Sequence, residues 1–229
     1  MRFRVDVAAS VPQMAWEDVH GPARAVVYEL IGGQNPDLAA GLHDSGWQGS
    51  PLRPVGVCPP VFLRAPRKRG CYATSPQGMV RLGSPVPQIA ATLLAALGGR
   101  SELRWGPVPL RVRGVQLEPA PDHSAGVALL ESVSPVVVKR DDRFLVPGDA
   151  GYEDRLVHNL RHKADVLGLP NEVEVEVVAS GPRRRFDTAK GFRIGAQATV
   201  RVAAAPQLLD AIYDWGLGLA TNQGFGWVK

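Results

Sequence analysis

The sequence predicts an α+β protein made of two consecutive β-α-β-β-α-β units, the element order of tandem ferredoxin-like domains. In each half, segments with alternating apolar residues, typical of strands, and segments with helical apolar spacing follow one another in that order. The proline-rich segment Pro119-Ala120-Pro121 separates the halves and reads as a linker. We therefore expect one domain over residues 1–118 and a second over 122–229, although no repeat is visible at the level of sequence.

The elements of the first half follow from turn and cap residues. Residues 2–7 alternate as a strand. Pro22 suits the first turn of a helix that Gly32-Gly33 ends, and Asn35 with Pro36 starts a second, short helix that stops near Gly46. The remaining predicted elements are two strands within 53–83 joined by the basic turn 66–70, a helix over 86–97 and a strand over 110–115.

The second half repeats the pattern. Val136–Val138 is predicted to be its first, buried strand. A helix over 156–167 ends at Gly168, and a second helix begins at Pro206. Strands are predicted over 172–177 and 192–202, with Arg183–Arg185 at the tip of the hairpin between them.

Composition limits the class of protein. The chain has 229 residues and is 45% apolar, which suffices for a core. It contains no apolar run of about 18 residues that could cross a membrane, and its first residues alternate as a strand rather than as a signal peptide. Cys58 and Cys71 have no partners at metal-ligand spacing, so we expect a reduced, cytoplasmic protein that binds no metal and no cofactor.

Positive charge is concentrated in the middle of the first half. Between Arg53 and Arg113 there are ten basic residues, nine of them arginine, and Glu102 is the only acid. Arginine suits bidentate phosphate contacts, so this span indicates a polyanionic partner, with a merely solvated basic face as the alternative.

Three further features bear on function. His43, at the end of the short helix, can transfer protons, or it can simply interact with the helix dipole. His158 and His162 lie four residues apart on one predicted helix, but without a third ligand we expect both to be exposed. The last fourteen residues contain four glycines around a polar tip, which predicts either a phosphate-binding loop or a plain hairpin.

Several segments resemble a known family. Tyr28 and the block Asn35–Gly46, which contains His43, are similar to the N-terminal signature of the CRISPR repeat-RNA processing endoribonucleases of the RAMP superfamily. Ser134–Lys139 and Asn159–Lys163 resemble segments in the second half of that family. The terminal Gly216–Gly218 and Gly224–Gly226 look like its glycine-rich loop.

This resemblance implies metal-independent cleavage of precursor crRNA, in which a 2′-OH attacks the adjacent phosphate and leaves 2′,3′-cyclic phosphate and 5′-OH ends. His43 would be the general acid or base, and Tyr28 would orient the attacking group. Some members have a lysine shortly after the histidine; here there is none, and Arg53 is the candidate replacement. The tip of the glycine loop also lacks the basic residues often found there.

The implied partners are CRISPR repeat RNA and a multisubunit CRISPR effector complex, with no membrane. The residues expected to bind RNA are Arg53, Arg64, Arg67, Lys68, Arg69, Lys139, Arg183, Arg184, Arg185, Gly216, Gly218, Gly224, Phe225 and Gly226.

Two other functions stay open. One is a non-catalytic RAMP subunit that binds guide RNA and scaffolds a complex; His43 favours the nuclease over it. The other is a ferredoxin-like metabolite sensor, against which the arginine-rich span argues.

Overall fold

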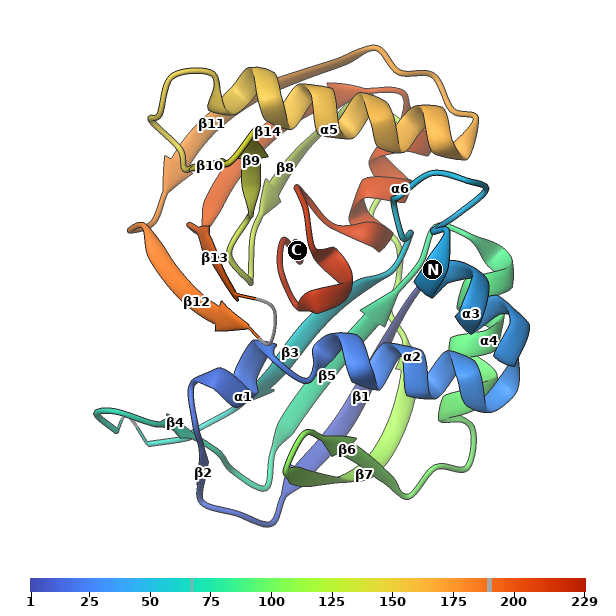
Figure 1. The fold of residues 1–229 in the computed structure, drawn as a ribbon, viewed down its shortest axis with the longest axis vertical. Coiled ribbons are helices and arrows are strands. Elements are labelled where there is room, and N and C mark those ends of the chain that lie inside the picture. Colours follow the sequence, from blue (N-terminus) through green and yellow to red (C-terminus); the bar gives the residue numbers. More distant parts are fainter. Residues whose placement is uncertain (67, 189–190) are drawn as a thin grey trace.

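A computed structural model describes residues 1–66, 68–188 and 191–229. It confirms a mixed α+β fold (Figure 1). The first half contains one antiparallel sheet with the strand order β3-β5-β1-β7-β6. Its strands are β1 (Arg2–Ala9), β3 (Gly56–Phe62), β5 (Gly78–Gly83), β6 (Glu102–Trp105) and β7 (Val108–Leu117). Because β5 lies between β1 and β3, this is the order of a split β-α-β unit.

The helices of the first half cover one face of this sheet. Alternate side chains of β1, from Phe3 to Val7, pack against helices α2 (Ala23–Gln34) and α4 (Pro87–Leu97) in one apolar core. Helix α3 (Pro36–Asp44) begins as predicted, because the Asn35 side chain accepts a hydrogen bond from the Leu38 amide at 3.0 Å. The smaller elements are α1 (Glu17–His20), β2 (Gln13–Met14) and β4 (Tyr72–Ala73).

The second half contains the antiparallel strand order β11-β14-β8. Its strands are β8 (Val127–Glu131), β11 (Val173–Ser180) and β14 (Ala198–Ala204), and helices α5 (Tyr152–Leu167) and α6 (Pro206–Trp215) pack on them in a second core. The end of the chain lies along β8, where Glu131 and Lys229 exchange backbone hydrogen bonds of 3.1 and 2.9 Å. This segment takes the place of a fourth strand, so the strand order of the first half recurs.

The structure corrects three predictions in this half. The first strand is β8, upstream of Val136–Val138, because the chain first pairs with β14 and then bends into the short hairpin of β9 (Val138–Arg140) and β10 (Arg143–Leu145). The predicted strand 192–202 is two strands, β13 (Gly191–Gly195) and β14. Arg183–Arg185 lie at the base of the hairpin of β12 (Arg184–Thr188) and β13, not at its tip.

Arg2 joins the two halves. Its guanidinium carbon lies 3.5 Å from the centre of the Tyr213 ring and 4.0 Å from that of the Trp227 ring. Nη1 donates to the carbonyl oxygen of Val228 at 2.7 Å, and Nη2 donates to that of Tyr213. The first strand of the first half is therefore anchored between two aromatic residues near the end of the chain.

Close backbone contact also joins the halves. A Cβ at Gly56 would lie 2.6 Å from the carbonyl oxygen of Trp215, and one at Gly83 would lie 2.4 Å from that of Asp214. Glycine at these two positions lets the end of α6 rest directly on β3 and β5. Among the residues described, no helix is long and apolar enough to cross a membrane.

Candidate active site

His43 lies on the last turn of α3 with its ring in solvent; 57% of the side chain is exposed. Its Nδ1 is 2.9 Å from Oδ1 of Asp44, and its ring meets that of Tyr28 edge-on, with centroids 5.4 Å apart. If Nδ1–H donates to Asp44, Nε2 is left with a free lone pair. The imidazole is therefore accessible and oriented by two neighbours, as proton transfer requires.

Arg53 holds this site together. Its Nε donates to the Tyr28 hydroxyl at 3.0 Å, Nη2 donates to the carbonyl oxygen of His43 at 2.6 Å, and Nη1 donates to that of Pro51 at 2.7 Å. The Tyr28 hydroxyl in turn donates to the carbonyl oxygen of Leu42 at 3.2 Å. The structure thus brings Tyr28, His43 and Arg53 together, and puts a permanent positive charge beside the histidine.

The loop after α3 returns the chain to this cluster. Gly46 has a positive φ of 76°, and a Cβ there would lie 2.0 Å from the carbonyl oxygen of Ser50. The Trp47 amide donates to the carbonyl oxygen of Leu52 at 2.9 Å, which closes the loop just before Arg53. Only glycine allows so tight a return, and the return is what places Arg53 next to His43.

A residue of the second half contacts this loop. Nε2 of His162, on α5, lies 3.4 Å from Oγ of Ser50. His158 is exposed as predicted, whereas His162 is half-buried, which corrects its predicted exposure. The contact depends on the packing of one half on the other, so spacing along the helix could not have revealed it.

The glycine-rich segment lies at the centre of the molecule, between the two halves (Figure 1, red). Gly216, Gly218, Gly224 and Gly226 all have positive φ. A Cβ at Gly226 would lie 1.9 Å from the carbonyl oxygen of Leu217, and the Leu217 amide donates to the carbonyl oxygen of Gly226 at 2.8 Å. These glycines therefore set a tight backbone path, and Phe225 and Gly226 are buried. Their role in RNA binding stays a prediction.

A basic cleft of about 360 Å³ opens beside this segment. Five cationic side chains line it, together with the loop tip 218–223: Arg24, Arg53, Lys139, Lys163 and Arg193. Arg53, Lys139 and Gly218 were predicted to bind RNA, whereas Arg24, Lys163 and Arg193 were not expected there. They come from α2, α5 and β13, which are far apart in the sequence.

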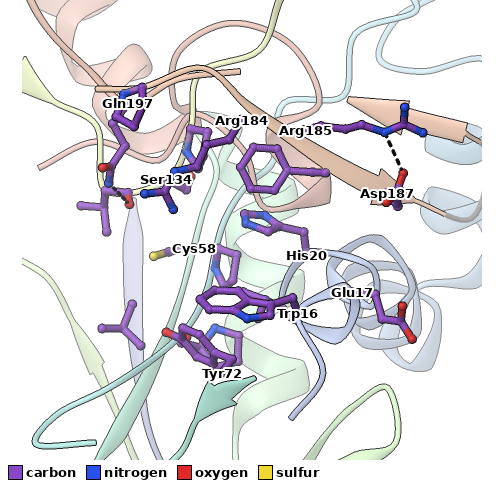
Figure 2. A pocket seen from close by; sticks show the side chains of 18 residues that line it. Trp16, Glu17, His20, Cys58, Tyr72, Ser134, Arg184, Arg185, Asp187 and Gln197 are labelled. Carbon is purple, nitrogen blue, oxygen red and sulfur yellow. Dashed lines mark hydrogen bonds and ion pairs between the residues drawn. The ribbon is translucent and has the colours of Figure 1, made fainter. Parts of the chain in front are cut away.

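A larger cavity of about 610 Å³ lies between the halves (Figure 2). Trp16, His20 and Tyr72 line it from the first half, and Ser134, Arg184 and Arg185 line it from the second. Arg184 and Arg185, which were predicted to bind RNA, therefore line this cavity, and the guanidinium of Arg185 is directed toward Asp187. No pattern in the sequence singled out Trp16 or His20, because α1 is a single turn without helical periodicity.

The other predicted basic residues lie elsewhere. Arg64, Lys68 and Arg69 are exposed on the segment between β3 and β4, which projects from the side of the molecule away from α3 (Figure 1). Arg67 lies outside the described residues. Their part in RNA binding stays a prediction.

The two cysteines lie outside the cluster of Tyr28, His43 and Arg53. Burial raises the pKa of the Cys58 thiol to about 11, and Cys71 is half-exposed. Within the described part of the chain, no group of three or more His, Cys, Asp or Glu side chains could hold a metal ion.

The molecule thus combines two α+β halves of the same strand order, a glycine-rich segment between them and a Tyr-His-Arg cluster beside a basic cleft. A family model described as CRISPR associated protein Cas6, C-terminal, matches residues 118–229. The chain is 23% identical over 215 residues to CRISPR-associated endoribonuclease Cas6 1 of Methanocaldococcus jannaschii, covering 89% of this chain and 82% of that protein. It is also 23% identical over 214 residues to CRISPR-associated endoribonuclease Cas6 of Pyrococcus furiosus, covering 90% and 80%.

Solved structures share the fold. A Cas6-related protein from Pyrococcus furiosus matches with a TM-score of 0.82 at 17% identity, over 100% of this chain and 97% of that one. A RAMP protein described as binding different RNA substrates matches with a TM-score of 0.83 at 18% identity, over 100% and 98%. A Cas6 product complex matches with a TM-score of 0.67 at 16% identity, over 99% and 97%. Residues 118–229 therefore match the Cas6 C-terminal family, and the whole chain shares the fold of solved Cas6 and RAMP structures.

Proposed function

We propose that this protein is an endoribonuclease that binds CRISPR repeat RNA and cuts precursor crRNA without a metal ion. The cluster of Tyr28, His43 and Arg53 carries the proposal, because it joins an accessible imidazole, an oriented phenol and a guanidinium within one network. The relatives described as endoribonucleases and the product complex support the same activity.

The proposed reaction is a transesterification. The 2′ oxygen forms a bond to the adjacent phosphorus, the bond from phosphorus to the 5′ oxygen breaks, and 2′,3′-cyclic phosphate and 5′-OH ends result. The proton of the 2′-OH is lost to a base, and the departing 5′ oxygen takes up a proton. His43 serves as general acid or base, and Tyr28 orients the attacking group. Arg53 stabilises the negative charge that develops on the phosphate.

We also interpret the two halves as tandem ferredoxin-like domains, divided at residues 119–121. The recurrence of one strand order in both halves supports this interpretation. In this arrangement the first domain supplies the Tyr-His-Arg cluster, and the second supplies the glycine-rich segment and most of the basic cleft.

The test is cleavage of repeat RNA in the presence of excess EDTA, with analysis of the product ends. We expect full cleavage and a 2′,3′-cyclic phosphate. A strict requirement for Mg²⁺, or products with a 3′-OH, would contradict the mechanism.

One observation favours a second function, a non-catalytic RAMP subunit that binds guide RNA in an effector complex. Arg53 donates hydrogen bonds from all three of its nitrogens to the Tyr28 hydroxyl and to backbone carbonyls, so fewer N–H groups remain to bind a phosphate. Tight binding of repeat RNA without any cleavage would select this function.

A further inference from the structure

Lys163 is a buried cation without a counter-charge. The residue is 1% exposed on α5, and its Nζ donates to the carbonyl oxygen of Gly216 at 2.6 Å. The ammonium also lies 4.8 Å from the centre of the Trp215 ring. Among the described residues, no carboxylate lies within ion-pair distance of it. A buried ammonium is normally paired, so this one requires an explanation.

The surroundings of Lys163 are positive. It lines the basic cleft with Arg24 of α2, Arg53 of the loop after α3, Lys139 of β9 and Arg193 of β13. None of the described residues that line this cleft is acidic. Outside the cleft lining, Oδ1 of Asp142 lies 3.2 Å from Nζ of Lys139; the aspartate is fully exposed, and the lysine is partly exposed.

Such an arrangement is unfavourable unless an anion completes it. Like charges that converge on a cleft destabilise one another, and the burial of Lys163 lowers the pKa of its ammonium to about 7. The neutral amine could still bond to the Gly216 carbonyl, so that hydrogen bond alone does not call for a lysine. Four further cations around the same space do call for a negatively charged ligand.

We propose that the basic cleft holds a backbone phosphate of the bound RNA, with Lys163 as the counter-charge at its inner end. The proposal rests on the proposed function, because RNA supplies the phosphate. Lys163 also has a positioning role. Because its Nζ donates to the carbonyl oxygen of Gly216, Lys163 connects a phosphate in the cleft to the backbone of the glycine-rich segment.

A bound phosphate changes the protonation of Lys163. An anion within a few ångströms favours the charged form of a lysine and raises its pKa. RNA binding slightly above pH 7 should therefore take up protons from solution. The arginines of the cleft cannot contribute, because they remain charged throughout this range. Histidine is the other side chain type that can take up protons near neutral pH, so the experiment also replaces His43 and His162, which lie in or against the active-site loop.

The experiment uses the His43→Ala protein, which keeps the RNA intact and removes one of these histidines. Calorimetric titration with repeat RNA at pH 7.5, in two buffers of different ionisation enthalpy, gives the number of protons taken up. We expect RNA binding to take up protons in the His43→Ala protein and to take up none in the double variant His43→Ala with Lys163→Met. The same substitution should weaken RNA binding about tenfold and lower the salt slope by roughly 0.7 to 0.9, the value of one phosphate contact.

Three controls distinguish the alternatives. Arg161→Met removes an exposed cation on the opposite face of α5 and should change neither quantity. His162→Gln should keep the proton uptake. Lys163→Arg keeps a charge at every pH, so it should bind RNA without proton uptake. If Lys163→Met does not melt cooperatively, the proton uptake of Lys163→Arg tests the site in its place.

Unchanged proton uptake in either Lys163 variant would contradict the phosphate site at Lys163 but not the proposed nuclease activity. Absence of RNA binding in the His43→Ala protein itself would overturn the proposed function as well. Inorganic phosphate should compete with RNA only weakly. If millimolar phosphate occupies the cleft and leaves RNA affinity unchanged, the ligand is free phosphate and the assignment to RNA fails.

Discussion

The ring of His20 is stacked on the ring of Phe225, with centroids 4.5 Å apart and planes 10° from parallel. His20 ends the short helix α1 of the first half, and Phe225 belongs to the glycine-rich segment. Nδ1 of His20 lies 3.1 Å from the carbonyl oxygen of Gly224, so its N–H can donate to that carbonyl. Burial lowers the pKa of His20 to about 4, which keeps the ring neutral at neutral pH. The neutral imidazole thus fixes the glycine-rich segment to the first half.

This contact predicts sensitivity to acid. A histidine in the unfolded chain takes up its proton near pH 6.5, whereas folded His20 does so only near pH 4. The stabilisation is therefore complete above pH 6.5 and is lost as the pH falls toward 4. We expect the free energy of unfolding to drop by about 1–2 kcal/mol between pH 7.5 and 5 on account of His20. Urea unfolding of wild type and His20→Phe measures this, with exposed His158→Gln as control; parallel pH profiles for all three would contradict it.

His43→Ala should lower the cleavage rate by roughly 10²-fold or more, because it removes the group that transfers the proton. RNA affinity should change little, since the imidazole is one contact among many. Single-turnover cleavage and filter binding measure the two effects separately. His158→Ala, at an exposed position on α5, should leave both unchanged. Equal loss of binding and cleavage in His43→Ala would remove His43 from the mechanism.

Arg53→Lys tests the network around the site. A lysine cannot bond simultaneously to the Tyr28 hydroxyl and to the carbonyl oxygens of Pro51 and His43, because it lacks the planar fork of arginine. We expect the single-turnover rate to fall about tenfold or more while RNA affinity, which depends on charge, is largely kept. Arg100→Lys, at a surface ion pair with Glu29, is the matched control. Wild-type cleavage by Arg53→Lys would show that only the charge is needed.

Gly224→Val should destabilise the fold. Gly224 has a φ of 87°, and a Cβ there would lie 2.8 Å from Cγ of Pro59. We expect a loss of about 3 kcal/mol or more, and melting temperature and RNA affinity should fall together. Gly49→Val is the matched control, since its φ is 79° with open space around it, and it should cost only about 1–2 kcal/mol. Equal melting temperatures for the two variants would exclude the packing explanation.

Local signals were enough to predict most helices and strands. The Asn35 cap, the proline starts and the glycine stops gave α2, α3, α4 and α6 nearly at their observed ends. Strand β8 was missed because the chain leaves its sheet and then forms a second pairing at Val136–Val138, whose continuous apolar run gave the stronger signal. The hairpin tip was misplaced because three consecutive arginines read as a polar turn.

The candidate site was only partly predictable. The resemblance to a family pointed to Tyr28 and His43, but no spacing rule connects Arg53 to them, since a ten-residue return of the chain has to form first. Lys163 did carry a signal in the sequence. It stands three residues after Leu160 and seven after Leu156, on the apolar side of α5, where a charged residue is unexpected. The other cations that line the same cleft come from other elements, and only the tertiary structure shows that they share it.

The sandwich of Arg2 between Tyr213 and Trp227 has a consequence for biosynthesis. A ribosome makes β1 long before the two aromatic residues, because almost all of this sequence lies between them. Until they emerge, the guanidinium of Arg2 has no aromatic partner, and the face of the first sheet that receives α6 is bare. The first sheet therefore lacks this anchor until Trp227 has been made, and only then can the two halves stabilise one another through Arg2.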